Sequence, residues 1–193
     1  MTMTISPRPV CRSGTGAEPG PGALVSGGAE AWIRDLGLAP HPEGGWFRET
    51  FRSPEVLPAS ALPARFGGDR ALTTSIVYLL RRGERSHFHR LHADEVWSHH
   101  AGGAMHVHVL GPAGPRTLVV GGPHPQAVVP HSTWFAAEPA PDAEFALVGC
   151  SVSPGFDFED FELASRDALL AEYPAQRELV LRFTRTPEEP AWP

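Results

Sequence analysis

Residues 86–100 read SHFHRLHADEVWSHH, and residues 105–108 follow closely with MHVH. Together these two short segments hold seven of the chain's ten histidines, with two acids, one arginine and one tryptophan among them. Apolar and polar residues alternate over short runs in both segments, and this period of two is typical of β-strands. The pattern predicts two strands, at residues 85–91 and 95–100, joined by a tight turn at residues 92–94.

Further short strands are predicted on both sides of this segment, because β-branched and aromatic runs alternate with turns of glycine and proline. They cover residues 46–52, 72–80, 104–110, 116–120, 126–129, 133–137 and 145–151. Helical spacing is confined to the two ends, at residues 29–36, 165–173 and 177–183. No helices separate the central strands, so the sequence predicts an all-β sandwich or barrel with short flanking helices at both ends rather than a parallel α/β fold.

Length and composition predict one globular domain, because a chain of 193 residues is long enough for one sizeable core. Residues 1–28 are rich in glycine, proline, serine and threonine and lack apolar periodicity, which predicts a disordered tail. The proline-rich residues 186–193 predict a second tail. We therefore expect the domain to span residues 29–185.

Charge and composition exclude several classes of function. The formal net charge of −6 argues against nucleic acid or an anionic membrane as a partner. No apolar run approaches the roughly 18 residues of a membrane span. Two cysteines are too few for a disulfide framework, and the N-terminus lacks the apolar segment of a signal peptide, so we expect a cytoplasmic protein. All 16 basic residues are arginine, which excludes lysine chemistry such as a Schiff base.

The histidine-rich segment resembles the first signature of the cupin superfamily, in which a glycine, a His-x-His, a glutamate and a second glycine follow one another at fixed spacing. Here Gly83, His89, Glu95 and Gly102 fit that spacing. A finer match, over roughly residues 29–184, resembles a branch of small single-domain cupins known as a domain of unknown function. Its motifs are HPEGG at 41–45, FRE at 47–49, HR at 89–90, DE at 94–95 with Trp97, Pro130 with Trp134, VGC at 148–150 and PGFDF at 154–158.

This resemblance implies a cupin jelly-roll barrel, also called a double-stranded β-helix, and a homodimer. It implies no particular activity, because the branch has none securely assigned. The chain also departs from the cupin pattern at two of the usual four metal-ligand positions. Leu91 stands at the second histidine of the first signature, and Phe135 stands at the histidine of the second signature.

Strand alternation predicts which side chains form the site, because successive residues of a barrel strand point alternately into the lumen and outward. If His89 and Glu95 point inward, His87 does so on the first strand, and Trp97 and His99 do so on the second. We expect His41 to form a hydrogen bond within its own turn, and Cys150 to pack in the core rather than to act as a nucleophile.

Three functions are compatible with this lumen patch. In a metal-dependent oxygenase or lyase, Fe, Ni, Mn or Zn would be bound by ligands drawn from His87, His89, Glu95 and His99. In a metal-independent isomerase or epimerase, His89 would be the base, and Glu95 would orient it or act as the partner acid. In a non-catalytic binding protein, Trp97, Trp134 and Phe135 would form an apolar pocket for a small molecule.

The leading hypothesis is the metal-independent isomerase or epimerase. His89 and Glu95 are the predicted catalytic residues. The predicted substrate-binding residues are His87, Arg90, Trp97, His99, Trp134 and Phe135. Arg90 is expected either to pair with Asp94 or Glu95 or to anchor an anionic substrate. The predicted partners are a small-molecule substrate and a second copy of the chain.

Overall fold

The computed structural model describes residues 27–111 and 114–185. Residues 1–26 and 186–193, on which the predicted tails fall, lie outside the described residues. The helices are α1 (Ala29–Leu36), α2 (Arg166–Glu172) and α3 (Arg177–Arg182). The strands are β1 (Ala39–Pro40), β2 (Trp46–Arg52), β3 (Val56–Leu57), β4 (Arg70–Ala71), β5 (Thr74–Arg81), β6 (Ser86–Leu91), β7 (Asp94–Gly102), β8 (Met105–Gly111), β9 (Gly114–Val120), β10 (Gln126–Val129), β11 (Trp134–Pro139), β12 (Phe145–Ser153) and β13 (Phe161–Leu163). Helix α1 and strands β2 and β10 have the predicted bounds.

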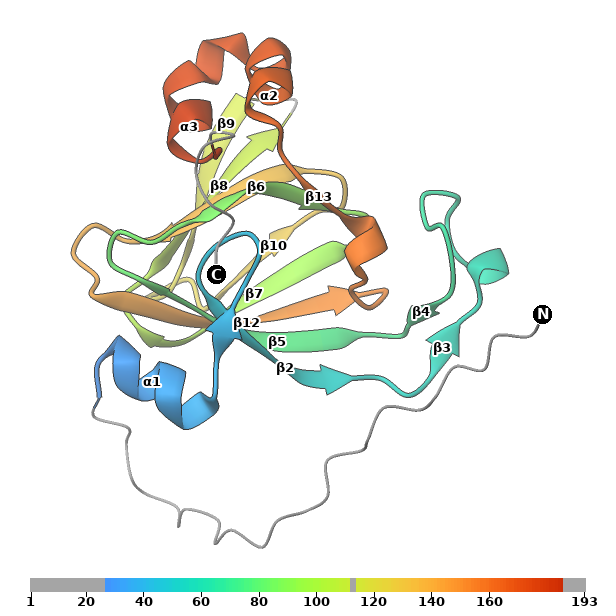
Figure 1. Ribbon diagram of the computed structural model, residues 1–193, viewed down its shortest axis with the longest axis horizontal. Helices are drawn as coiled ribbons and strands as arrows, with labels where there is room; N and C mark the ends of the chain where they lie inside the picture. Colours follow the sequence, from blue (N-terminus) through green and yellow to red (C-terminus); the bar gives the residue numbers. More distant parts are fainter. Residues whose placement is uncertain (1–26, 112–113, 186–193) are drawn as a thin grey trace, which may run out of the picture.

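Two antiparallel sheets pack face to face, which confirms the predicted all-β architecture (Figure 1). One sheet has the strand order β1-β2-β5-β12-β7-β10, and the other has the order β13-β6-β11-β8-β9. The chain crosses repeatedly from one sheet to the other, so β6 and β7, which are consecutive in sequence, lie in different sheets. A small ribbon of β3 and β4 extends from one end of the barrel (Figure 1).

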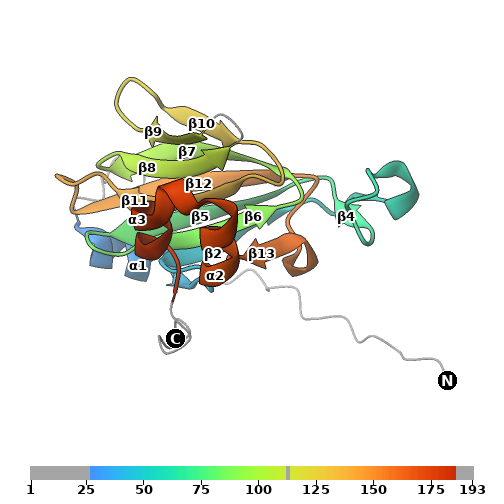
Figure 2. The same cartoon turned by 90° about the horizontal axis from the view of Figure 1, so that it is seen from above.

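The helices cover the outer faces of the two sheets (Figures 1 and 2). Helix α1 ends at Gly37, which adopts a left-handed conformation with φ of 61°, and packs against Leu79 and Leu147 of the six-stranded sheet. Helices α2 and α3 cover a second cluster on the five-stranded sheet, which includes Phe88 and Trp134. Among the described helices, none has the length and apolar character that crossing a membrane requires.

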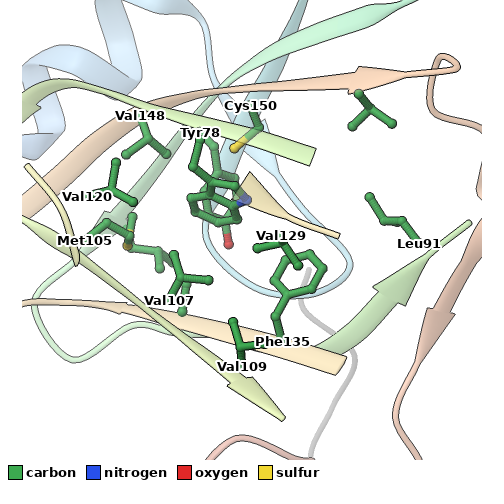
Figure 3. Packing of buried hydrophobic residues seen from close by; sticks show 14 of the residues in the cluster. Tyr78, Leu91, Met105, Val107, Val109, Val120, Val129, Phe135, Val148 and Cys150 are labelled. Atoms are coloured by element: carbon green, nitrogen blue, oxygen red, sulfur yellow. The ribbon is translucent and has the colours of Figure 1, made fainter. Parts of the chain in front are cut away.

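The main core lies between the sheets, where inward side chains of both meet. Figure 3 shows this meeting, with Tyr78, Val148 and Cys150 from the six-stranded sheet opposite Val107, Val109 and Phe135 from the five-stranded sheet. Cys150 packs within this core, as expected from its position in a strand. The packed core fills one part of the space between the sheets and leaves a cavity in another.

Irregularities in strand pairing change the direction of side chains at three places. One extra residue lies in β2 between Glu49 and Phe51, one in β6 between Ser86 and His89, and one in β7 at position 100. A β-bulge of this kind shifts the alternation of the residues beyond it to the opposite face. Consequently, two residues that are three apart can share one face, and this happens on both β2 and β6.

Candidate active site

A cavity of about 220 Å³ lies between the sheets, at the end of the barrel where β5 and β7 begin. Strands β2, β5, β6, β7 and β12 form its wall, with the loop between β1 and β2 and residues 156–161. Apolar and aromatic side chains dominate the wall. Two histidines and two glutamates of the wall are buried, namely His41, His89, Glu43 and Glu95, whereas Glu49, Arg52 and Asp157 lie at the more exposed mouth.

His41 and Glu43 reach the cavity from the loop between β1 and β2. This loop lies so close to the start of β6 that a Cβ atom at Gly44, whose φ is 114°, would clash with the backbone carbonyl of Arg85. Gly44 O accepts a hydrogen bond from the Tyr78 hydroxyl at 2.7 Å, and His87 N donates to Glu43 O at 2.9 Å. These contacts fix the backbone of the loop and aim the Glu43 side chain into the barrel.

His89 makes a polar contact through each of its ring nitrogens. Nδ1 lies 2.7 Å from His87 O, so it carries the ring hydrogen and donates. Nε2 lies 3.2 Å from Glu43 Oε2, and Ser86 Oγ donates to Glu43 Oε1 at 2.9 Å. Burial raises the pKa of Glu43, and a protonated Glu43 carboxyl group beside a neutral His89 imidazole avoids the repulsion of two bare acceptors at 3.2 Å.

Glu95 faces the same cavity from the opposite sheet, because it lies on β7 whereas His89 lies on β6. Trp97 Nε1 donates to Glu95 Oε2 at 2.9 Å, and the Cys150 thiol, which also lines the cavity, contributes to lowering the pKa of this carboxyl group. The wall around Glu95 is otherwise largely apolar, and the carboxyl group has no basic partner in any contact that the structure gives for the described residues.

Burial controls the protonation of this cluster. It raises the pKa of Glu95 to about 8, with a further contribution from the nearby Glu43 carboxyl, and it also raises the pKa of Glu43 itself. Burial lowers the pKa of His89 to about 4 and lowers that of His41, where the Glu43 carboxyl opposes the shift. At neutral pH, a protonated Glu95 therefore faces a neutral His89 across the cavity.

The mouth of the cavity combines one ion pair with an aromatic cluster. The bulge in β2 places Glu49 and Arg52 on the same face, where Arg52 Nε and Nη2 bind the two carboxylate oxygens of Glu49 at 3.1 and 2.7 Å. Arg52 Nη1 also donates to Phe156 O at 3.1 Å. The rings of Phe156, Phe158 and Phe161 contact one another beside this pair.

Three of the predicted site residues line the cavity. His89, Glu95 and Trp97 lie in the wall, as strand alternation predicts. Phe135 points into the core, and its ring centroid lies 4.0 Å from that of His89, behind the cavity wall. His41 makes the expected contact in its turn, since Glu43 N donates to His41 Nδ1 at 3.3 Å, but it lines the cavity as well. The catalytic and binding roles of these residues stay predictions.

His87 and His99 do not line the cavity, contrary to their predicted place in the lumen patch. The bulge in β6 breaks alternation between His87 and His89, so His87 contacts the loop backbone through Nδ1 at 2.7 Å from Glu43 O and does not line the cavity. His99 follows alternation, but it lies farther along β7 and lines a separate depression with Gly103 and Phe145.

Arg90 and Trp134 lie on the outer face of the five-stranded sheet, because each is adjacent in its strand to an inward residue. Trp134 packs under α2 and α3. The Arg90 guanidinium lies 4.4 Å from the centroid of the Trp134 ring and pairs with Glu162 at 2.7 Å, rather than with Asp94 or Glu95. Neither residue lines the cavity.

Glu43 is the functional candidate that strand alternation missed, because it lies on a loop and the period-two pattern applies only within strands. The signal in the sequence was the HPEGG motif at residues 41–45. Its two glycines allow close approach of the loop to the chain, Gly44 to the backbone of Arg85 just before β6 and Gly45 to β5. The backbone geometry of the loop positions this acid, which lies between a proline and two glycines. Its contact with His89 depends on the tertiary packing of the loop, which the sequence pattern does not reveal.

The cavity residues do not fit the divalent metal that the cupin pattern implies. Leu91 and Phe135, at two of the expected ligand positions, present apolar side chains. His89 Nε2 already contacts Glu43 Oε2. Across residues 27–111 and 114–185, no three histidine, cysteine, aspartate or glutamate side chains are arranged to hold a metal ion.

Comparison with known proteins agrees with this architecture. The chain matches the family model described as Cupin superfamily (DUF985) over residues 30–164. The chain belongs to the cupin superfamily. Its two-sheet barrel is therefore the cupin jelly roll predicted from the histidine-rich segment, and the family is the branch of unknown function that the motifs indicate.

Two solved structures resemble this cupin over nearly their whole length. A hypothetical protein from Leishmania major is 32% identical with a TM-score of 0.75, and the match covers 83% of this chain and 100% of that chain. A protein from Shewanella oneidensis is 41% identical with a TM-score of 0.73, covering 82% of this chain and 98% of that chain. No curated protein matches the chain. Neither the family description nor these two names state an activity.

Proposed function

We propose that this cupin is a metal-independent isomerase or epimerase that moves a proton on a small carbonyl compound. One observation carries the proposal: a buried acid, Glu95, and a buried base, His89, face one cavity from opposite sheets. Proton transfer beside a carbonyl needs both functions, because one group removes the proton from carbon while the other donates a proton to the oxygen or to the opposite face of the carbon.

The protonation states of the two residues at neutral pH support these roles. Glu95 keeps its proton at neutral pH and can donate it, whereas His89 is neutral and can accept one at Nε2. The Nε2 contact with Glu43 is 3.2 Å, at the long end of the range for hydrogen bonds, so a substrate proton can compete for this nitrogen. Glu43 contacts the same nitrogen and keeps its own proton while His89 accepts the proton of the substrate.

The reaction then balances without an external acid or base. The Glu43–His89 pair takes a proton from the carbon next to the carbonyl, and Glu95 donates its proton to the carbonyl oxygen, which gives an enol. The His89 imidazolium then returns a proton to carbon, and the enol O–H returns its proton to Glu95, which restores the enzyme. Return of the proton to the opposite face of the same carbon gives an epimer, and return of the proton to a neighbouring carbon gives an isomer.

Exchange of carbon-bound hydrogen tests this proposal directly. Acetophenone and cyclohexyl methyl ketone are incubated with the protein in D₂O, and loss of the α-proton signal is followed by NMR. We expect His89→Ala and Glu95→Gln each to slow the catalysed exchange by about a hundredfold or more. His124→Ala is the matched control, because His124 is exposed and lies outside the cavity.

Three results would contradict the proposal. Exchange at the same rate in wild type and both variants would remove the catalytic assignment, and ketone binding without exchange would favour the non-catalytic binding protein. Stoichiometric Fe, Ni, Mn or Zn in protein purified without a histidine tag would contradict the metal-independent mechanism. The homodimer and the cytoplasmic location stay predictions from the sequence.

A further inference from the structure

Phe158 is an exposed aromatic residue at the mouth of the cavity. Its exposed fraction is 59%, although it also contributes to the cavity wall. Its ring centroid lies 5.0 Å from that of Phe156 and 6.3 Å from that of Phe161, both in edge-to-face arrangements. An apolar ring at the edge of a cavity remains hydrated until a ligand covers it, so its burial would contribute to binding.

The backbone that carries this aromatic cluster is held in place before any ligand arrives. Phe156 O accepts from Arg52, and Phe156 N donates to Thr74 Oγ1 at 2.9 Å. On the other side, Arg70 Nε and Nη2 bind Asp160 at 2.7 and 2.8 Å. The rings are therefore presented on a fixed frame, and a ligand pays little conformational entropy to order them.

The aromatic surface continues from the mouth to the reacting groups. The Phe161 ring contacts Phe158 at the mouth, and its centroid lies 5.4 Å from that of the His89 imidazole, tilted by 31°. Phe47 forms another part of the wall, with its ring 4.5 Å from that of His41. A ligand that reaches from His89 to Phe158 must therefore lie along ring faces and edges.

We propose that the substrate is an aromatic or conjugated carbonyl compound, and that Phe158 is the specificity-determining residue that packs on its flat body while the carbonyl lies between His89 and Glu95. This inference rests on the proposed function for the position of the carbonyl. A flat unsaturated group binds more tightly because its electrons interact with the quadrupoles of these rings in addition to its burial. The binding of a saturated group is stabilised only by burial.

The test compares two ketones that share the reacting group and differ in the ring. Acetophenone has a flat aromatic ring, and cyclohexyl methyl ketone has a saturated one. Their dissociation constants are measured by NMR titration from the indole N–H signal of Trp97, which lies in the wall and is identified by its loss in Trp97→Phe. We expect wild type to bind acetophenone about two- to tenfold more tightly.

The matched variants are Phe158→Leu and Phe51→Leu. Phe51 is 50% exposed and does not line the cavity, so it offers the same residue type at similar exposure. We expect Phe158→Leu to remove the preference for the aromatic ketone and Phe51→Leu to keep it. Because the readout is a ratio within one protein sample, a change in the folded fraction cannot imitate this result.

Equal affinities for the two ketones in wild type, a preference that survives in Phe158→Leu, or no binding of acetophenone would each overturn the inference. The proposed function fails separately. Aromatic preference without α-proton exchange would contradict the isomerase and support this substrate class, whereas exchange without aromatic preference would contradict only the substrate class.

Discussion

His89 Nε2 lies 3.2 Å from Glu43 Oε2, although one residue is on a strand and the other on a distant loop. The contact gives the imidazole a carboxyl partner other than Glu95, the acid of the cupin signature. Glu95 is thereby left to act alone on the opposite sheet. This division of two carboxyl groups between two roles is the structural basis of the proposed acid–base chemistry.

The rate of α-proton exchange should fall as pH rises through about 8, because Glu95 then loses the proton that it donates. The Trp97 indole N–H lowers the pKa of Glu95 by stabilising its ionised form. We therefore expect Trp97→Phe to move the alkaline limb of the pH–rate profile to higher pH. A limb that stays in place in this variant would contradict the role of Glu95 as the titrating acid.

Replacement of Glu95 by glutamine should stabilise the fold increasingly with pH. The folded pKa of about 8 exceeds the ordinary value of 4.5, so the folded state binds more protons than the unfolded state between these limits. The contribution of Glu95 to the free energy of unfolding of wild type therefore falls as pH rises from 4.5 to 8. Glutamine does not titrate, so the advantage of Glu95→Gln should grow over this range to the order of several kcal/mol.

Urea unfolding at a series of pH values measures this difference, and the titration of groups that do not interact with Glu95 cancels in the comparison of the two proteins. A difference in the free energy of unfolding that stays flat from pH 4.5 to 8 would show that Glu95 is already ionised at neutral pH in the folded state. The general-acid role would then be lost as well.

Removal of Asp160 should destabilise the protein, because Arg70 and Asp160 form a buried ion pair with side chains only 3% and 5% exposed. Asp160→Asn leaves the Arg70 charge without its closest carboxylate, at an expected cost of about 3–5 kcal/mol in the free energy of unfolding. Glu159→Gln is the control, because Glu159 contacts the same arginine at 3.4 Å from a side chain that is 73% exposed. Equal effects of the two substitutions in urea unfolding would contradict this prediction.

Arg90→Gln should leave ketone binding and α-proton exchange unchanged, because Arg90 lies on the outer face of its sheet. Its pair with Glu162 is partly exposed, so we expect the free energy of unfolding to change by less than about 1 kcal/mol. NMR titration and urea unfolding check both statements. Weaker ketone binding in this variant would restore Arg90 as a substrate anchor.

The strands were predictable from the sequence because each is a short alternating or β-branched run between glycine and proline turns. Residues 46–52 and 126–129 illustrate this, since their predicted and observed bounds agree. The cupin spacing that links Gly83, His89, Glu95 and Gly102 also predicted the superfamily. These features depend on the order and spacing of residues that are close together in the sequence, which a single sequence shows directly.

The failures arose where a partner strand or a distant loop decides the direction of a side chain. His87 is turned out of the cavity wall by a bulge that exists only relative to β11. Trp134 and Phe135 are neighbours in one strand, so they cannot both face the lumen, and it is Phe135 that packs against His89. Glu43 reaches its partner through tertiary packing of a loop, which no periodic pattern reveals.

Helices α2 and α3 follow residue 164, where the match to the family model ends, yet they cover Phe88 and Trp134 on the five-stranded sheet. A chain shortened at that residue would keep all thirteen strands that the structure describes and would expose these rings to water. Exposed aromatic patches of this kind promote aggregation. Crystallisation or screening of this protein should therefore use a chain that continues at least to residue 185, because solubility depends on helices that the family boundary omits.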